Sequence, residues 1–264
     1  MAYASFIYEV KDAIATVRLN DPARLNALTF QTYEELERLF QDLAQDDSVK
    51  VVIITGTGKG FCSGGSVHEI IGKLMDMNAE ELNRFTRMTC NVVKNMRNLK
   101  KPVIAAVNGI AAGAGAMLAL ASDLRIVSDR AKFAFLFTKV GLSGADMGAL
   151  YLLPKIVGQG RAIELLFLGD AIDAQEAYRI GLANRVVEHE ALTDEAYQLG
   201  RRLKEAPLHA LGVTKELVKR EANMDLGEAL QLEAAAQARC MQTADFREGY
   251  KAFVEKRAPV FNKS

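Results

Sequence analysis

The 264-residue sequence has no tryptophan, only five prolines and only three cysteines. Cys62, Cys90 and Cys240 are odd in number and far apart, so we expect neither a disulfide framework nor a metal cluster. This usage is typical of a reducing compartment and predicts a cytoplasmic protein. Charge of one sign is also missing, because 33 Lys and Arg balance 33 Asp and Glu. Proteins that bind nucleic acid usually carry a basic excess, so nucleic acid is not an expected partner.

Long apolar runs are absent as well. No stretch approaches the ~20 apolar residues of a membrane-spanning helix, and the N-terminus lacks a basic segment followed by an apolar one. We therefore expect neither a membrane span nor a signal peptide. Half of the residues are nevertheless hydrophobic, which is enough for one large domain with a sizeable core.

The central stretch, residues 102–123, predicts a buried strand, a tight turn and the start of a helix. Val103–Val107 is a short apolar run, Asn108-Gly109 interrupts it, and Gly113-Ala114-Gly115 leads into an apolar helix. The first N–H groups of a helix have no partner inside it and lie at the positive end of its dipole. Such a turn could hold a phosphate or a developing oxyanion. Close packing of a small-residue helix against a sheet explains the stretch equally well.

A second glycine loop strengthens the first explanation. Val51–Ile54 predicts another buried strand, which ends in a loop that continues through Gly64, Gly65 and Ser66. Right-handed crossovers would make the two strands parallel and bring both loops to the same edge of the sheet. The N–H groups of Gly65 and Ala114 could then converge on one oxygen atom.

The whole pattern predicts an α/β core over residues 1–200 and a helical C-terminal region over residues 201–264. The chain is expected to be helical from Thr193 to about Val254, with breaks near Pro207 and Asn223. The segment 228–241 is more apolar than one buried face requires, which predicts a subunit contact. The expected strands are 6–10, 13–19, 51–54, 103–107, 124–127, 132–135 and 186–187. Thr29 is expected to cap the first helix of the core, which Asp46-Asp47 closes. The other expected helices of the core cover 67–74, 79–99, 161–168 and 174–180, and one more begins near Ala149.

Several of these segments together resemble the crotonase superfamily, the enoyl-CoA hydratases and isomerases. They are Phe61-Cys62-Ser63-Gly64-Gly65, Lys101–Gly109, Gly113-Ala114-Gly115 and Ala121-Ser122-Asp123, and the likeness covers nearly the whole chain. It implies a crotonase-like spiral of ββα units with a C-terminal helical trimerisation region, and trimers that often pair into hexamers. It also implies an acyl-CoA substrate whose thioester oxygen binds the N–H groups of Gly65 and Ala114. No metal or organic cofactor is expected besides the CoA of the substrate.

The resemblance also implies binding residues. Arg24-Leu25-Asn26-Ala27-Leu28 is similar to the family's early CoA-binding segment, and residues 253–257 are similar to its C-terminal tail. Basic side chains suit the phosphates of CoA, and the tail residues would come from a neighbouring subunit. The expected binding residues are Arg24, Leu25, Ala27, Ser63, Gly65, Ser66, Val67, Met117, Phe137, Phe253 and Lys256. For Ser66, capping of the following helix is the favoured role.

The sequence departs from the family at its two usual glutamates. Met117 and Phe137 stand at those positions, so water addition by two carboxylates is in question and the pocket is more apolar. Asp146 remains, in a place that resembles the aspartate of the dienoyl-CoA isomerases. It is our candidate acid or base, and capping of the next helix is the structural alternative.

These features predict hydration or double-bond isomerisation of an enoyl- or dienoyl-CoA, and the missing glutamates favour isomerisation. Hydrolysis of a thioester, or a ring-opening hydrolysis, on the same scaffold is a second hypothesis. A third is a catalytically silent scaffold that binds CoA or RNA.

Overall fold

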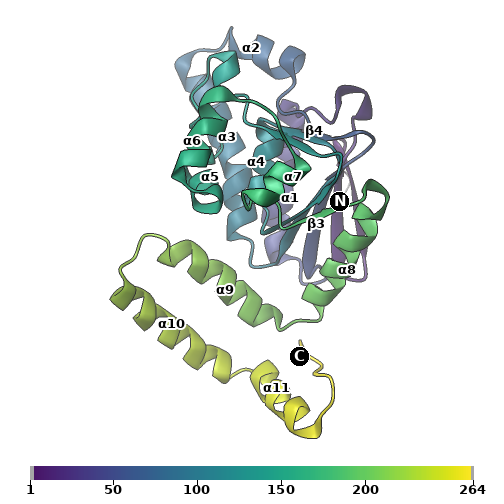
Figure 1. The fold of residues 1–264 in the computed structure, drawn as a ribbon, viewed down its shortest axis with the longest axis vertical. Helices are drawn as coiled ribbons and strands as arrows, with labels where there is room; N and C mark the ends of the chain where they lie inside the picture. The colour runs from purple at the N-terminus through teal and green to yellow at the C-terminus, as the bar shows by residue number, and fades with distance from the viewer. Residues whose placement is uncertain (1–2, 263–264) are drawn as a thin grey trace.

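The computed structural model describes residues 3–262, which form two β-sheets surrounded by helices and an arm of further helices (Figure 1). Within this range the larger sheet has six strands and the smaller has four. In the larger sheet the order is β1 (Phe6–Lys11), β2 (Ile14–Leu19), β3 (Val51–Gly56), β5 (Val103–Val107), β7 (Leu124–Ser128) and β10 (Arg185–Val187). In the smaller sheet it is β4 (Gly60–Cys62), β6 (Ile110–Ala112), β8 (Lys132–Ala134) and β9 (Ile172–Asp173).

The two sheets are built together as the chain advances. Strands β3, β5 and β7 lie parallel in the larger sheet, and each is followed directly by a parallel strand of the smaller one. Helices follow each pair. The helices of the core are α1 (Phe30–Gln45), α2 (Gly72–Leu74), α3 (Ala79–Asn98), α4 (Ala114–Ala121), α5 (Ala149–Val157), α6 (Gln159–Leu168), α7 (Ala174–Arg179) and α8 (Leu192–Lys204). This succession confirms the predicted spiral of ββα units.

One prediction about the central stretch is wrong. The sequence predicted that the strand 103–107 turns directly into a helix, but β6 lies between β5 and α4. Strands β4 and β9 were missed too. These strands have two or three residues, too few to show a period-2 pattern, and long-range pairing alone makes them strands. The expected strands 103–107 and 51–54 are confirmed as β5 and most of β3.

Helix α4 lies in the middle of the molecule, and every one of its residues is buried. It packs so closely on β4 that a Cβ atom at Gly115 would overlap the carbonyl oxygen of Cys62. The small residues of α4 therefore serve close packing, and binding of a phosphate or oxyanion at its N-terminus stays a prediction.

This contact leads to a first prediction. Gly115→Ala should destabilise the protein by at least ~2 kcal/mol, because β4 and α4 must separate to admit the methyl group. Gly160→Ala, in α6, has no atom near the new methyl group and should stabilise slightly, since alanine favours helix more than glycine does. Urea unfolding of both variants measures the difference. Equal midpoints would contradict the packing argument.

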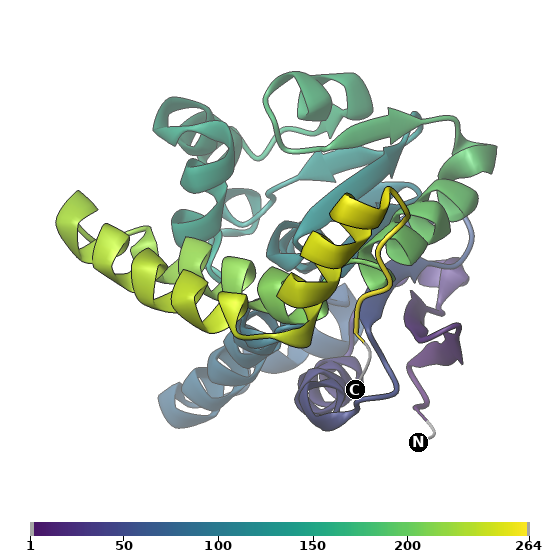
Figure 2. The same cartoon turned by 90° about the horizontal axis from the view of Figure 1, so that it is seen from below.

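The C-terminal arm contains α9 (Leu208–Glu221), α10 (Leu226–Met241) and α11 (Ala244–Glu255), which extend away from the sheets (Figures 1 and 2). The breaks near Pro207 and Asn223 are confirmed, and a further break at residues 242–243 was missed. A buried ion pair holds α9 on the core, in which Lys215 Nζ lies 2.7 Å from Asp123 Oδ2. Among the ion pairs of residues 3–262, no other one joins a helix of the arm to the core. The division at residue 200 stays a prediction, and in the structure it falls inside α8.

The arm leaves large apolar side chains exposed. On α10 and α11 they include Leu226, Leu230, Met241, Tyr250 and Phe253. A subunit contact would cover them, and trimer formation stays a prediction. No helix within residues 3–262 is long and apolar enough to cross a membrane.

Candidate active site

The two glycine loops meet where β4 and β6 end. These strands pair in parallel, with Cys62 opposite Ala111, so the residues that follow them lie side by side. A Cβ atom placed on Gly64, whose φ is 99°, would lie 3.6 Å from the backbone nitrogen of Ala114. The structure therefore brings the loop of Gly65 against the first residue of α4.

Neither predicted N–H donor is used by the hydrogen bonds that hold this junction. Leu28 and Gly65 form a parallel bridge in which the N–H groups of Leu28 and Ser66 donate, at 2.7 and 2.8 Å. The N–H of Gly65 lies outside that bridge. Ala114 is the first residue of α4, so its N–H has no acceptor inside the helix and lies at the positive end of the dipole.

The predicted CoA-binding segment lies beside this junction. Ser63 donates from its N–H to Leu25 O at 2.9 Å and from its hydroxyl to Arg24 O at 3.1 Å. The Arg24 guanidinium pairs with Asp21 at 2.6 Å and also with Glu69, which raises its pKa. Of the predicted binding residues, Arg24, Leu25, Ala27, Ser63, Gly65, Ser66 and Val67 are therefore assembled by two neighbouring segments.

Two buried asparagines that sequence reasoning did not assign hold the loop after β3. The Asn26 amide donates to Thr57 O and Gly60 O, at 3.0 and 2.8 Å. The Asn108 amide donates to Gly58 O and Gly60 O, at 2.9 and 3.0 Å. An Asn beside a glycine turn was the available signal, but its partners are distant in sequence.

Ser66 has the role that the sequence favoured. Its buried hydroxyl oxygen accepts from the N–H of Glu69 at 3.2 Å and caps a π-helical turn, Val67–Ile71. The Val67 side chain is exposed at the entrance of this turn.

Asp146 lies in the loop before α5, half-buried. Burial raises the pKa of its carboxyl above 3.8, although the N–H of Met147 donates to the carboxylate and opposes that shift. Capping does not explain it, because the residue that caps α5 is Gly148, with no side-chain bond. The backbone carbonyl of Asp146, and not its carboxylate, accepts the N–H of Ala149 at 2.8 Å.

Met117 and Phe137 are both buried, Met117 on α4 and Phe137 just before a 3₁₀ turn, Thr138–Val140. Neither side chain can donate or accept a proton. The acid–base role of Asp146 and the donor role of the two backbone N–H groups stay predictions.

Tyr33 on α1 lies near Gly65 and was not among the predicted site residues. It is 3% exposed, and its hydroxyl lies 4.0 Å from the place a Cβ atom on Gly65 would take. Burial raises its pKa well above 10.0, and the charges of Cys62 and Asp146 add to the shift. Its hydroxyl therefore stays protonated at neutral pH.

The tail residues do not reach this site within one chain. Phe253 is 83% exposed on α11, at the far end of the arm from α2 and β4 (Figure 1), and Lys256 follows as the residue that ends α11. Their contribution from a neighbouring subunit stays a prediction.

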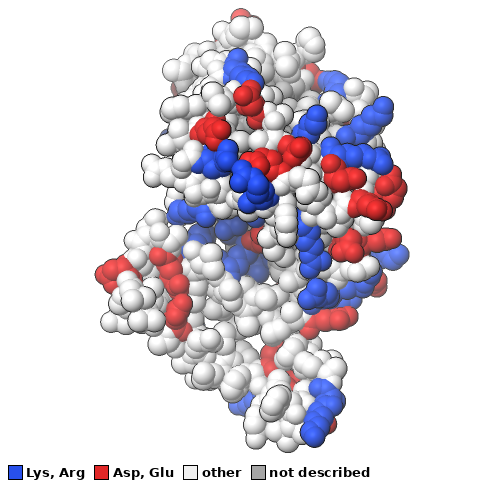
Figure 3. Space-filling view, in the orientation of Figure 1, with Lys and Arg blue, Asp and Glu red and all other residues white. Residues whose placement is uncertain are grey.

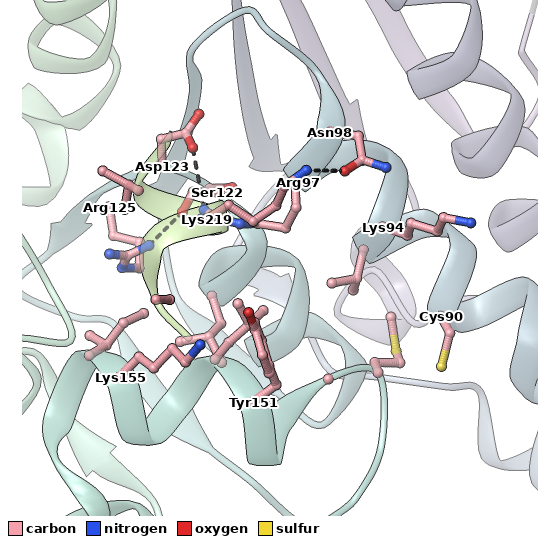
Figure 4. Close-up of a pocket in the computed structure, with 18 residues that line it drawn as sticks. Cys90, Lys94, Arg97, Asn98, Ser122, Asp123, Arg125, Tyr151, Lys155 and Lys219 are labelled. Atoms are coloured by element: carbon pink, nitrogen blue, oxygen red, sulfur yellow. Dashed lines mark hydrogen bonds and ion pairs between the residues drawn. The ribbon is translucent and has the colours of Figure 1, made fainter. Parts of the chain in front are cut away.

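A cavity of about 520 Å³ lies between α3, the end of α4, α5 and α9 (Figure 4). Lysine and arginine side chains gather in this hollow between core and arm (Figure 3). Three of its labelled cations have partners: Arg97 pairs with Asp123, Lys219 donates to Asn98, and Lys155 lies 3.6 Å from the ring centre of Tyr151. The lining includes Met147 and Gly148 but neither Gly65 nor Ala114, so the cavity only adjoins the site.

Metal ligands are not grouped at the site or elsewhere in the described range. Among residues 3–262, no three His, Cys, Asp or Glu side chains lie close enough together to hold a metal ion.

Comparison with known proteins agrees with this architecture. The sequence model of the enoyl-CoA hydratase/isomerase family matches residues 9–264. The 1,2-epoxyphenylacetyl-CoA isomerase of Escherichia coli (strain K12) is 37% identical, with 96% of each chain covered. The crotonyl-CoA hydratase of Syntrophomonas wolfei is 35% identical, with 99% of each covered.

Solved structures show the same fold. A crystal structure of a Streptomyces coelicolor A3(2) relative has a TM-score of 0.97 and 46% identity, covering 99% of this chain and 95% of that one. The enoyl-CoA hydratase of Bacillus anthracis has a TM-score of 0.91 and 32% identity, covering 98% and 99%. The spiral of ββα units is thus shared with proteins of the enoyl-CoA hydratase/isomerase family. The chain belongs to the enoyl-CoA hydratase/isomerase family, within the crotonase superfamily.

Proposed function

We propose that this protein isomerises a double bond in an unsaturated acyl-CoA. In this proposal the N–H groups of Gly65 and Ala114 hold the thioester oxygen, and Asp146 removes and returns a proton. The observation that carries it is one half-buried carboxylate in a site whose two other acid–base positions hold Met117 and Phe137.

The chemistry follows from where charge develops. Removal of a proton from the acyl chain moves negative charge onto the thioester oxygen, which two preorganised N–H donors stabilise. Loss of one such donor typically costs ~3–4 kcal/mol of transition-state stabilisation. Return of the proton to another carbon of the conjugated system completes the isomerisation, so no water is consumed.

The surroundings of Asp146 suit a base that works near neutral pH. Burial raises its pKa, which strengthens it as a base while leaving it able to ionise. Met117 and Phe137 offer no group that could orient or activate a water molecule. This disfavours addition of water across the double bond.

The substrate's CoA portion is proposed to lie along residues 24–28 and 63–67. Arg24 would attract its phosphates, with Phe253 and Lys256 of a neighbouring subunit completing the site in a trimer or a hexamer. We propose that no metal or further cofactor takes part.

Hydration is the second candidate, and the names of relatives favour it. The Syntrophomonas wolfei relative is a hydratase, whereas the Escherichia coli relative is an isomerase. A chain that hydrates with Asp146 alone would need a water held by the backbone.

One experiment separates these reactions. The protein is incubated with a panel of saturated, enoyl-, dienoyl- and aromatic CoA thioesters, and the products are analysed by mass and by chromatography. An isomer of unchanged mass supports the proposal, a product heavier by one water supports hydration, and free acid indicates hydrolysis. Binding of every thioester with conversion of none would favour a silent scaffold.

A further inference from the structure

One guanidinium nitrogen of Arg125 has no hydrogen bond, although the side chain is buried. Arg125 lies on β7 and is 5% exposed. Its Nε donates to Leu182 O at 2.6 Å, and its Nη1 donates to Ser122 O at 2.6 Å and to Ala119 O at 3.4 Å. Among the hydrogen bonds of residues 3–262, these are all that the side chain makes, so Nη2 has no partner there.

This nitrogen opens into the cavity between core and arm. The fully enclosed side-chain atoms that lack a partner belong to Asp42, Thr57 and Glu221, and no atom of Arg125 is among them. Nη2 is therefore in contact with open space, and Arg125 lines the cavity of about 520 Å³ (Figure 4). Buried donors nearly always have a partner, so this cavity is expected to hold an acceptor for Nη2.

The charge of Arg125 also lacks a counterion. The lining contains five Lys and Arg side chains but one carboxylate, that of Asp123. That carboxylate already pairs with Arg97 at 3.4 Å and with Lys215 at 2.7 Å. Within the described range, no ion pair includes Arg125. Burial lowers the pKa of Arg125 to about 10, so the guanidinium keeps its charge at neutral pH. Buried charges are normally paired, and an anion in the cavity would supply the missing partner.

Much of the remaining lining is apolar. Val93 on α3, Leu152 and Ile156 on α5 and Val218 on α9 all face the cavity. An inorganic phosphate would satisfy Nη2 but would leave these side chains against water. A carboxylate on a hydrocarbon body satisfies both parts of the lining, and the volume lies in the usual range for small-molecule sites.

We propose that this cavity binds an amphipathic organic acid, with its carboxylate on Arg125 and its hydrocarbon body against the apolar side chains of α3 and α5. The site is separate from the proposed thioester site, because the lining contains neither Gly65 nor Ala114. Met147 lines the cavity and follows Asp146 directly, so a bound acid would contact the loop that carries the candidate base.

Calorimetry with octanoate tests this inference. Octanol keeps the hydrocarbon body without the charge, and inorganic phosphate keeps a charge without the body. We expect octanoate to bind at least ~10-fold more tightly than either one, because the hydrogen bond to a charged group is lost with octanol and the apolar contact is lost with phosphate. Equal affinities for octanoate and octanol, or no binding of octanoate, would overturn the inference.

A second titration separates this cavity from the thioester site. Octanoate is titrated with and without saturating acetyl-CoA, whose acyl group is short, and binding of acetyl-CoA is measured in the same instrument. The affinity for octanoate should change less than ~2-fold, since the two ligands occupy different places. Displacement of octanoate by acetyl-CoA would place it in the thioester site and would contradict the inference.

Two cysteines locate the bound acid. Cys90 is exposed and lines this cavity, whereas Cys240 lines another pocket, within the arm. Octanoate should slow the alkylation of Cys90 by iodoacetamide in proportion to the fraction of protein bound, and leave that of Cys240 unchanged. Peptide masses measure both rates. Protection of Cys240 alone, or of neither cysteine, would show that octanoate does not bind in this cavity.

Variants test the charge itself. Arg125→Gln should weaken octanoate binding ~10–100-fold and change octanol binding less than ~2-fold. Because Arg125 also holds Leu182 O and Ser122 O, its loss can lower stability, so melting temperatures are measured and Lys155→Gln serves as a second variant. Lys155 lines the cavity from the exposed side of α5, and its loss should weaken octanoate binding ~3–10-fold.

The matched control is Lys11→Gln, which makes the same change of charge on an exposed residue of β1, outside the cavity. It should leave the affinity for octanoate unchanged. Equal affinities in the wild type and in Lys155→Gln and Arg125→Gln would overturn the inference. None of these measurements requires turnover, so failure of the proposed isomerisation would leave their outcome unaffected.

Discussion

Asp146→Asn should lower the turnover number ~10²–10⁴-fold on the thioester that the wild type converts, the usual contribution of a general base. The affinity for CoA esters should change little, because the amide keeps the size of the carboxyl group. Steady-state kinetics and calorimetry on the same preparation measure both quantities. An unchanged turnover number would eliminate Asp146 as the base.

The pH profile gives an independent check. A base must be ionised, and burial raises the pKa of Asp146, so the wild-type rate should fall on the acid side with a midpoint above 3.8. This limb should be missing from the residual activity of Asp146→Asn.

The same substitution should raise stability at neutral pH. Since the folded pKa is above the unfolded one, ionisation of Asp146 disfavours the folded state at pH 7. The variant's advantage should shrink as the pH falls through the raised folded pKa and vanish below 3.8. This pH dependence of the stability difference is expected for a base whose buried position serves catalysis and lowers stability.

Ala114→Pro should lower the turnover number ~10²–10³-fold, the loss measured when one donor of such a site is removed. Proline is accepted at the first position of a helix because the N–H it lacks is not used by the helix. The substitution therefore deletes the proposed donor and keeps the hydrogen bonds of α4.

The matched control for this variant is Ala79→Pro, which replaces an exposed alanine at the same position of helix α3. It should leave both turnover and melting temperature close to the wild type. If Ala114→Pro melts like the wild type and turns over as fast, the N–H of Ala114 does not serve the reaction.

The sequence predicted the elements that local patterns encode. β5 was expected at residues 103–107 and lies there, because five apolar residues between Pro102 and Asn108 permit little else. The Ser66 cap and the end of α7 before Gly181 also follow from residues within one turn.

Features that depend on distant partners were missed. β4 becomes a strand only by pairing with β6, which also pairs with β8, and Asn26 reaches Gly60 across more than thirty residues. Tyr33 shows the same limit, because only the packed structure places its hydroxyl 4.0 Å from the position that a Cβ atom on Gly65 would take.

By itself the sequence determined the family, the glycines that allow close approach, and the replacement of two carboxylates by Met117 and Phe137. These are properties of residue identity and of neighbours in the chain. The tertiary structure decided that Gly65 and Ala114 lie at one junction, that Asp146 is no helix cap, and that Tyr33 lies near Gly65. Such facts depend on which surfaces meet when the spiral closes, and no local pattern records that.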